Sequence, residues 1–292
     1  MKNNFTKINV KSALHKVKGN FPFHWDLNVY RGCAHGCVYC YALYSHDYLQ
    51  ADGDFYHKIY VKENLVEVLE KELRKKSWKG EMVNLGGVTD SYQPLEKSME
   101  MMRDILKLFI KYRNPLTIST KSDLILRDID LYAQLANLTH VNVSVTITTP
   151  DESIRQKIEP SASDSARRFD VLKAFSRTSV STGLHIMPII PFVTDDKDDL
   201  EALFQKASQC HVDYLLTGKL YLRGKTRPRF IGFMREEFDK HFQQFARIYN
   251  QEAARLDYTT RLNAKIKQLR NKYHIGIYQP PKLENQGQLR LF

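Results

Sequence analysis

Apolar residues follow two periodicities along this chain, and segments of the two kinds alternate. Six short runs rich in β-branched and aromatic residues indicate strands at residues 25–30, 81–85, 116–120, 141–148, 182–187 and 212–216. Between these runs, apolar residues recur at helical spacing over residues 61–76, 95–111, 126–135, 165–176 and 198–208. Six alternations of strand and helix predict an α/β fold with a parallel sheet covered by helices, in the form of an incomplete (β/α)6 barrel.

Polar residues gather in the segments that follow the predicted strands. The first strand leads into a cysteine loop, the second into Gly86-Gly87-Val88-Thr89-Asp90, and the third into Thr120-Lys121-Ser122. The fourth strand ends in residues 144–149, and the fifth ends in Met187-Pro188-Ile189. Active sites of (β/α) barrels lie at the carboxyl ends of the strands. We therefore expect these five segments to face one mouth of the barrel.

The net charge of +11 is concentrated at the two ends of the chain. Residues 219–292 hold 16 Lys plus Arg against 6 Asp plus Glu, residues 1–31 hold 6 against 1, and the remainder holds 22 against 26. We therefore divide the chain into a basic amino-terminal segment (1–23), the partial barrel (24–218) and a basic helical extension packed on the barrel (219–292). The extension has predicted helices at about 233–249 and 260–273. Cationic ends suit a polyanionic partner, and they equally suit a solvated face that aids solubility.

Length and composition favour one large globular domain. A chain of 292 residues with 42% hydrophobic residues can bury a sizeable core. No apolar run has the length of a membrane span, and the basic amino terminus lacks the apolar stretch of a secretory signal. We therefore expect a cytoplasmic protein without a membrane partner.

Three of the four cysteines lie in one short segment, Arg31-Gly32-Cys33-Ala34-His35-Gly36-Cys37-Val38-Tyr39-Cys40-Tyr41. Cubane iron–sulfur clusters normally take four Cys thiolates, so this C-x-x-x-C-x-x-C trio would leave one iron open to another ligand. A zinc site would need a fourth protein ligand, for which His24, His35 and His46 are near in sequence. A disulfide is disfavoured in a cytoplasmic chain. Cys210 lies far along the chain, and we interpret it as a small buried hydrophobe.

The cysteine spacing, with an aromatic residue before the third Cys, resembles that of the radical S-adenosylmethionine (SAM) superfamily. Over most of the chain the surrounding pattern is similar to the branch related to spore photoproduct lyase. The segments that carry this resemblance are Asn28-Val29-Tyr30-Arg31-Gly32-Cys33, Tyr39-Cys40-Tyr41, Thr89-Asp90-Ser91-Tyr92-Gln93-Pro94, Thr120-Lys121-Ser122 and Ile158-Glu159-Pro160. The resemblance implies a [4Fe-4S] cluster whose free iron chelates SAM. In such enzymes an electron cleaves the S–C bond of SAM, and a 5'-deoxyadenosyl radical abstracts a substrate hydrogen.

By the same resemblance, Cys33, Cys37 and Cys40 would ligate the cluster. The residues implied for SAM are Gly86, Gly87 and Asp90 after the second strand, Thr89 and Lys121 at the methionyl carboxylate, Ser144 at the ribose, and the strand end Met187 to Ile189 at the adenine. Each also has a structural alternative, such as a turn for the glycines, a helix cap for Asp90, a surface position for Lys121 and a contact between strands for Ser144. Their joint position at successive strand ends favours cofactor binding.

Tyr39 and Tyr41 flank the third cysteine and look like the tyrosines proposed to relay hydrogen in spore photoproduct lyase. The alternative is that their rings only pack on the loop. The resemblance also implies a hydrogen-donating cysteine just before Thr89-Asp90, where this chain has Gly87 or an apolar neighbour. A thymine-dimer lyase reaction with that donor is therefore not predicted. The expected electron donor is a protein such as flavodoxin or ferredoxin.

The segment after the sixth strand gives the substrate prediction. It interleaves cations with aromatic residues, namely Lys219, Arg223, Lys225, Arg227 and Arg229 with Tyr221 and Phe230. Cations neutralise phosphates and rings stack on bases, so we expect a DNA or RNA substrate, in repair or modification. Alternatively, this segment is a clamp that closes the barrel with Tyr221 and Phe230 in the core.

Two other functions remain open on the sequence alone. One is a radical SAM enzyme that acts on a protein or with a second radical SAM protein, docked on the basic tail. The other is a nucleic-acid-binding module whose cluster is structural or redox-sensing. The latter needs a fourth cluster ligand, and the sequence offers no obvious one.

Overall fold

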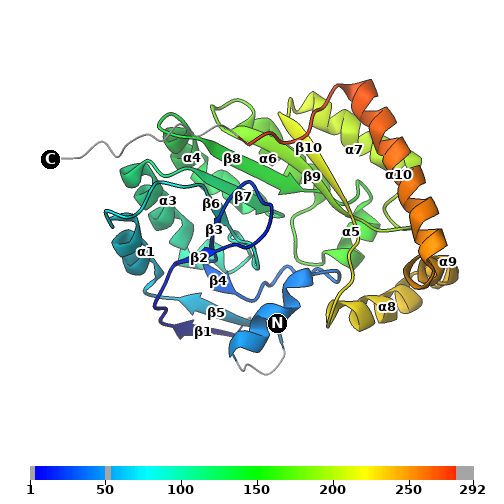
Figure 1. Ribbon diagram of the computed structural model, residues 1–292, viewed down its shortest axis with the longest axis horizontal. Helices are drawn as coiled ribbons and strands as arrows, with labels where there is room; N and C mark the ends of the chain where they lie inside the picture. Colours follow the sequence, from blue (N-terminus) through cyan, green and yellow to red (C-terminus); the bar gives the residue numbers. More distant parts are fainter. Residues whose placement is uncertain (1–3, 50–53, 281–292) are drawn as a thin grey trace.

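The main sheet has seven strands in the order β10-β9-β8-β7-β6-β3-β2 (Figure 1). The computed structural model describes residues 4–49 and 54–280. Six parallel strands correspond to the six predicted ones: β3 (Trp25–Leu27), β6 (Val83–Leu85), β7 (Leu116–Thr120), β8 (Val141–Thr146), β9 (Ser181–Ile189) and β10 (Tyr214–Lys219). A short strand, β2 (Leu14–Lys16), pairs antiparallel with β3. The described part of the sheet is open between β10 and β2, so the predicted incomplete (β/α)6 barrel is confirmed.

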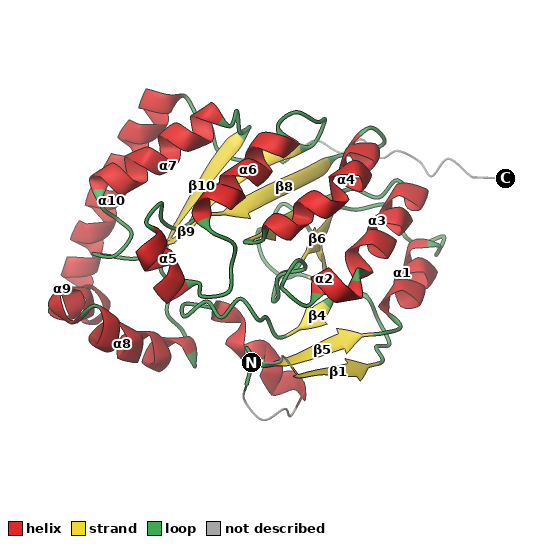
Figure 2. Cartoon of the chain, turned by 180° about the vertical axis from the view of Figure 1, so that it is seen from behind, coloured by secondary structure: helices red, strands yellow, loops and turns green. Residues whose placement is uncertain are grey.

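Alternation along the strands gives the sheet two different faces. Leu116 and Ile118 of β7 lie in the main hydrophobic core, whereas Thr117 and Ser119 between them face the other side. The core face is covered by helices, as Figure 2 shows: α1 (Leu65–Leu73), α3 (Met101–Tyr112), α4 (Ile129–Ala136), α6 (Ser165–Phe175) and α7 (Lys197–Gln209). Full burial of one large side chain, such as Phe109 of α3, stabilises the fold by about 1.5–3 kcal/mol.

The first predicted strand divides between two sheets. The chain leaves the main sheet after Leu27, where the Asn28 side chain accepts a hydrogen bond from the Val88 amide (2.9 Å). A second sheet, in the order β1-β5-β4, contains β1 (Asn4–Ile8), β4 (Tyr30–Arg31) and β5 (Lys58–Lys62). Residues at the start of the predicted helix 61–76 therefore belong to a strand, whose residues Ile59 to Val61 are bulky and buried. Helix α1 begins only at Leu65.

Two further predicted helices are interrupted by polar contacts. Residues 95–111 divide into α2 (Glu96–Met99) and α3, because Glu100 between them adopts a left-handed conformation with φ 50°. The buried Glu96 carboxylate accepts a hydrogen bond from the Met102 amide (3.0 Å) and pairs with Arg127 (2.7 Å), so it caps α3. Residues 126–135 begin as a 3-10 segment, η2 (Asp123–Asp128), before α4.

Three helices follow β10, where the sequence predicts two: α8 (Thr226–Glu237), α9 (Asp239–Asn250) and α10 (Glu252–Tyr273). Helix α10 runs along one end of the sheet, and α9 and α8 lie at the lower end of α10 (Figure 1). A second hydrophobic core joins α8 and α9 to the barrel, and it contains Phe230 and Phe245 together with Cys37 and Tyr39. The extension therefore packs directly against the cysteine loop.

Two elements near the barrel mouth were not predicted. Helix α5 (Glu152–Ile158) follows β8, and a 3-10 helix, η1 (Tyr41–Leu49), follows the cysteine loop. Residues 1–3 and 281–292 of the predicted basic ends lie outside the described residues. No helix in the described ranges is long and apolar enough to cross a membrane.

Candidate active site

The cysteine loop begins directly after β4 and is held by backbone contacts. Gly32 has φ +80°, and a Cβ there would lie 2.8 Å from the Phe55 carbonyl oxygen, so glycine is required. The Cys33 amide donates to that same carbonyl (3.1 Å), and the Tyr56 hydroxyl donates to the Cys37 carbonyl (2.8 Å). The Cys40 amide in turn donates to the Cys37 carbonyl (3.1 Å). These contacts fix the loop against residues 55 and 56.

The three thiols of this loop are free and lie close enough to interact. Cys33 and Cys37 are buried, and Cys40 is partly exposed. Burial raises the pKa of Cys33, and the charges of Asp90, Cys37 and Cys40 raise it further. Burial also raises the pKa of the Cys37 thiol to about 12, against the opposing charge of Lys121. Cysteines ligate metal as thiolates, so a bound cluster would hold these sulfurs deprotonated.

These donors fit a cluster better than a single metal ion. Within residues 4–49 and 54–280, no three His, Cys, Asp or Glu side chains converge on one metal position. Histidines proposed for zinc are engaged elsewhere, since His35 Nδ1 lies 3.1 Å from the Ser161 carbonyl and His46 Nε2 lies 3.0 Å from the Lys58 carbonyl. His24 is exposed. A cubane takes each Cys on a different iron, which suits three separated sulfurs on one loop.

The loop after β6, which contains Gly86 and Gly87, contacts the carboxylate of Asp26 in β3. Gly86 has φ +84°, and a Cβ there would lie 2.7 Å from the Thr89 carbonyl oxygen. A Cβ on Gly87 would lie 2.5 Å from Asp26 Oδ2, and the Gly87 amide donates to Asp26 Oδ1 (3.1 Å). The Tyr41 hydroxyl donates to the Gly87 carbonyl from the opposite side of the loop. Both glycines are therefore required by close contacts within the protein, and their contact with SAM stays a prediction.

Thr89 and Gln93 tie the glycine loop to the cysteine loop. The Thr89 hydroxyl donates to the Gly32 carbonyl (2.6 Å), and Gln93 Nε2 donates to the same oxygen (3.2 Å). Gln93 Oε1 accepts a hydrogen bond from the Ala34 amide (2.9 Å). Gln93 holds the two loops together, and sequence reasoning gave it no role although it lies in a motif that carried the resemblance. Thr89 thus has a structural partner, and its contact with a carboxylate of SAM stays a prediction.

Asp90 joins three loops at the mouth. Its carboxylate accepts hydrogen bonds from the Thr120 hydroxyl (2.8 Å) and the Lys121 amide (2.8 Å), and it lies 3.1 Å from His35 Nε2. Burial would raise the pKa of Asp90, but the His35 charge and these hydrogen bonds hold it well below its usual value. Asp90 therefore remains ionised and fixes the position of Lys121.

A buried ionic network surrounds Lys121. Its ammonium lies 5.8 Å from the centre of the Tyr39 ring, and the Tyr39 hydroxyl donates to the Glu159 carboxylate. Glu159 Oε2 lies 2.6 Å from Arg168 Nη2, and both side chains are fully buried. Burial lowers the pKa of Lys121, but the charges of Cys37, Glu159 and Asp90 outweigh it and raise the value. Among the described residues, Lys121 Nζ has no hydrogen-bond acceptor, so this cation is available to an anionic ligand.

Glu159 and Arg168, like Gln93, are residues around the site to which sequence reasoning gave no role. Glu159 lies in the segment Ile158-Glu159-Pro160, which was quoted without a role. Arg168 sits in an amphipathic helix, where an arginine is normally solvent-exposed. Its Nε and Nη1 donate to the carbonyls of Ser163 (2.7 Å), just before the helix, and of Thr146 (2.8 Å), at the end of β8.

The residues predicted for ribose and adenine lie deeper in the sheet. The Ser144 hydroxyl donates to the Ile118 carbonyl (2.9 Å), and Ile189 is fully buried in the main core. Met187 precedes a cis peptide bond to Pro188, and a Cβ on Gly218 would lie 2.8 Å from its Cγ. Contacts of these residues with SAM stay predictions.

The five cations predicted for nucleic acid lie on the surface between the end of β10 and the first turn of α8, and two of them contact residues that neighbour the cysteine loop. The Thr226 hydroxyl donates to the Cys40 carbonyl (2.7 Å) and fixes the start of α8 there. Arg229 stacks over the Tyr56 ring at 4.6 Å, and Lys225 pairs with Asp47 of η1. Burial raises the pKa of Cys40, and the charges of Lys121 and Arg229 oppose that shift.

The other three cations lie farther from the loop. Lys219 Nζ donates to the Thr259 hydroxyl (3.2 Å), Arg223 stacks over Tyr221 at 5.0 Å, and Arg227 Nη2 donates to Asn250 (3.4 Å). Tyr221 is 60% exposed, whereas Phe230 is fully buried. The alternative prediction that both rings lie in the core is therefore confirmed for Phe230 and wrong for Tyr221.

Several known proteins are similar to this chain. Uncharacterised proteins of Mycobacterium tuberculosis are 30% identical over 291 residues, which cover 98% of this chain and 86% of the relative. An uncharacterised protein of Methanocaldococcus jannaschii is 32% identical over 196 residues, which cover 64% of this chain and 72% of the relative. These relatives support a shared sequence family along nearly the whole chain.

Solved structures of spore photoproduct lyase share the fold. A point mutant of that lyase matches with a TM-score of 0.67 at 12% identity, over 94% of this chain and 81% of the lyase. A mutant with bound AdoMet and dinucleoside spore photoproduct matches with a TM-score of 0.59 at 13% identity. This second match covers 78% of this chain and 66% of the lyase, so about a third of the lyase has no counterpart in this chain.

A sequence model described as the radical SAM superfamily matches residues 27–205. This range contains the three clustered cysteines, both loop glycines, Lys121 and the buried Glu159–Arg168 pair. The match covers more than half of the chain. The chain therefore belongs to the radical SAM superfamily, a family of enzymes that use a [4Fe-4S] cluster and SAM.

Proposed function

We propose that this chain is a radical SAM enzyme that acts on nucleic acid, in repair or modification. The observation that carries the proposal is the contact between the cationic start of α8 and the cysteine loop. Thr226 bonds to Cys40, and Arg229 stacks on Tyr56, whose hydroxyl bonds to Cys37. A polyanion bound along α8 would therefore lie next to the place where radical chemistry begins.

The chain's own residues would position SAM. A bound cluster would supply the one-electron chemistry that cleaves SAM. Cys33, Cys37 and Cys40 would hold the cluster, and Lys121 would pair with the methionyl carboxylate, because its ammonium lacks an acceptor in the described part of the chain. The backbone of Gly86 and Gly87 would face the methionyl amine.

Tyr39 and Tyr41 are proposed to return a hydrogen atom to the substrate radical. Tyr39 is buried with its hydroxyl on Glu159, whereas Tyr41 is 63% exposed with its hydroxyl on the Gly87 carbonyl. Residues 86–94 contain no cysteine, so a thiol in this loop does not serve as the terminal donor. The proposed reaction therefore differs in that step from the one that the resemblance to spore photoproduct lyase implies.

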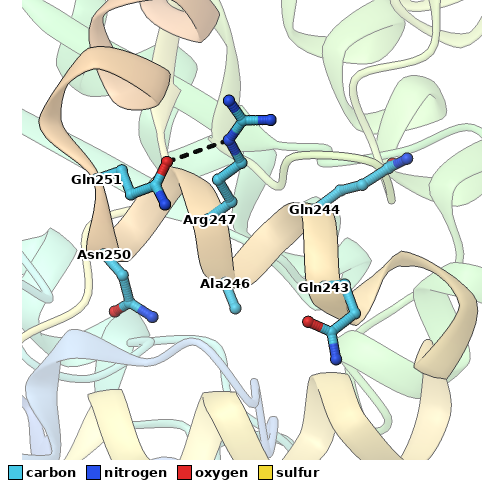
Figure 3. A pocket seen from close by; sticks show the side chains of 6 residues that line it. All are labelled: Gln243, Gln244, Ala246, Arg247, Asn250 and Gln251. Atoms are coloured by element: carbon cyan, nitrogen blue, oxygen red, sulfur yellow. Dashed lines mark hydrogen bonds between the residues drawn. The ribbon is translucent and has the colours of Figure 1, made fainter.

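The exposed surface of the extension supports a nucleic-acid substrate. Arg223 and Tyr221 form an exposed stacked pair, which can neutralise a phosphate and stack on a base. Beside Arg227, α9 lines a depression of about 450 Å³. Figure 3 shows Gln243, Ala246 and Asn250 pointing to one side of α9, which offers amide groups to a polar ligand.

The salt dependence of oligonucleotide binding tests this proposal. We expect the reconstituted protein to bind a fluorescent single-stranded oligonucleotide with an affinity that falls steeply as salt rises. Neutralising Arg223 or Arg227 with Gln should each lower the slope of log affinity against log salt by about 1. Lys107→Gln, which removes an exposed cation of α3, is the matched control and should leave the slope unchanged.

Absence of binding, or equal slopes for all three variants, would overturn the nucleic-acid proposal. A protein substrate or a second radical SAM protein docked on the extension would then be favoured. A nucleic-acid-binding module without catalysis would instead bind with the expected slope but form no 5'-deoxyadenosine. The physiological electron donor, such as a flavodoxin or ferredoxin, and the cytoplasmic location stay predictions.

A further inference from the structure

A second cationic surface forms where the chain leaves α1. The segment Arg74-Lys75-Lys76-Ser77-Trp78-Lys79 carries four cations and no acidic residue. It belongs to the middle part of the chain, whose summed charge is slightly negative, so charge counts along the sequence do not reveal it. The side chains of all four cations are exposed.

The fold brings two other stretches of the chain to this segment. The Trp78 ring packs edge-on against the Trp25 ring of β3, with 5.3 Å between centroids. Lys16 of β2 is the partner of Trp25 across the two strands, and its ammonium lies 5.5 Å from the centre of the Trp25 ring. Trp78 Nε1 also donates to Asn114 Oδ1 (2.7 Å), whose neighbour Arg113 is exposed. Cations from three separate stretches therefore lie around the two tryptophans.

The loop between β2 and β3 adds aromatic rings to these cations. The Val17 amide donates to the His24 carbonyl (2.9 Å), which closes the loop and continues the pairing of the two strands. Phe21 and Phe23 stack within the loop, with 5.5 Å between centroids and 18° between planes, and Phe21 is 52% exposed. The loop also carries the exposed Lys18 and no acidic residue.

Neighbouring acids do not neutralise this surface. We call it the α1 surface, and its cations are Lys16, Lys18, Arg74, Lys75, Lys76, Lys79 and Arg113. None of these cations forms an ion pair with a residue of the described ranges. The nearest acids along the chain from the Trp78 segment are already bonded, since Glu72 accepts from the Leu14 amide (2.8 Å) and Glu81 accepts from Trp25 Nε1 (2.8 Å). Such an unpaired cluster of cations attracts a polyanion.

Helix dipoles account for only part of this cluster. Arg74 and Arg113 are the C-cap residues of α1 and α3, where a cation offsets the negative end of the helix dipole. Lys76 and Lys79 lie beyond the end of α1, and the two lysines of the β2–β3 hairpin belong to no helix. A ligand outside the helices is therefore needed to explain them.

The α1 surface and the start of α8 lie at the two edges of the open sheet. Strands β2 and β10 are the edge strands of the described main sheet, so the open side of the partial barrel lies between them. Strand β10 leads into the cationic start of α8, and β2 carries Lys16. Helices α1 and α8 lie on opposite sides of the molecule (Figure 1). A polyanion that crosses the open side can therefore contact both surfaces.

We propose that the α1 surface is a second binding surface for nucleic acid, in which the lysines bind backbone phosphates and Phe21 stacks on an unpaired base. This inference rests on the proposed function, in which the same strand contacts the start of α8. Cations interleaved with exposed aromatic rings fit single-stranded nucleic acid, which presents phosphates and the flat faces of bases together.

Tryptophan emission reports directly on this surface, because Trp25 and Trp78 are the only tryptophans in the sequence. We expect their emission to change when the reconstituted protein is titrated with unlabelled oligothymidylate. The double variant Lys75→Gln/Lys76→Gln should diminish this change. It should also lower the slope of log affinity against log salt by about 1.4, at about 0.7 for each phosphate contact on a single strand.

A control of equal charge separates position from net charge. Lys107→Gln/Lys197→Gln removes two exposed lysines from α3 and α7, and it should leave the slope and the emission change as in the wild-type protein. Phe21→Ala should weaken oligothymidylate binding about fivefold by removing the stacked ring, and it should leave the salt slope unchanged because no cation is lost. Wild-type affinity in Phe21→Ala would overturn the stacking role of Phe21.

The outcomes distinguish this inference from the proposed function. A slope that falls in Arg223→Gln but not in Lys75→Gln/Lys76→Gln, without a change in tryptophan emission, would overturn the α1 surface and leave the proposed function supported. A slope that falls in both would support both proposals. A slope that falls only in Lys75→Gln/Lys76→Gln would support the α1 surface and contradict the contact along α8. A wild-type protein that binds no oligonucleotide would overturn both.

Discussion

Buried charged residues determine the geometry around the cysteine loop. Glu159 accepts a hydrogen bond from the Tyr39 hydroxyl and pairs with Arg168, which in turn donates to the carbonyls of Ser163 and Thr146. The sequence predicts the thiols and Lys121 because their residue types and spacing indicate chemistry. It does not predict Arg168, because only the folded chain shows that this arginine is buried. Local sequence thus predicts the ligands of the site and misses the groups that position them.

The Glu159–Arg168 pair should dominate local stability. We expect Arg168→Met to lower the free energy of unfolding by about 3 kcal/mol or more, because it leaves a buried carboxylate without its cation. Urea unfolding of the reconstituted protein measures this loss. Arg167→Met is the matched control, since Arg167 is exposed and pairs with Asp123 at 3.2 Å. This substitution should lower the free energy of unfolding by less than about 1 kcal/mol. Equal losses of unfolding free energy in the two variants would contradict a stabilising role of the Glu159–Arg168 pair.

The elements of the barrel follow from local patterns, and their ends follow from tertiary contacts. All six parallel strands are predictable, because β-branched runs alternate with helical spacing along the chain. Strands β1 and β5 are not predictable in this way. They pair across about fifty residues of sequence, and β5 is followed directly by a helical pattern. The sequence also does not predict the break between α2 and α3, because this break depends on the buried contact of Glu96 with Arg127.

Packing of β9 against β10 should depend on Gly183. We expect Gly183→Ala to lower the free energy of unfolding by about 1–3 kcal/mol, because its Cβ would overlap the Tyr214 ring. Gly232→Ala in α8 is the control, since nothing lies within 4 Å of the added Cβ, and alanine should stabilise that helix by about 0.5–1 kcal/mol. Thermal unfolding compares the two variants. A Gly183→Ala protein as stable as the wild type would show that the Tyr214 ring does not lie across this glycine.

Across the whole molecule, the basic extension and the barrel share one core at the cysteine loop. Phe230 and Phe245 of the extension pack with Cys37 and Tyr39, so α8 and α9 form a wall of the site. Charge along the sequence predicts a cationic extension. Its contact with the cluster loop becomes visible only in the folded chain. This arrangement places a surface suited to polyanions beside the residues that hold the cofactors.

Formation of 5'-deoxyadenosine from SAM is the most direct test of this account. The protein is reconstituted without oxygen, reduced with a strong reductant and assayed with and without added DNA or RNA. We expect formation in the wild-type protein and in Cys210→Ala, which removes the thiol outside the loop, and loss of formation in Cys37→Ala. Stimulation by nucleic acid would further support the proposed substrate class. Absence of 5'-deoxyadenosine from a wild-type protein that holds a full cluster would contradict the account.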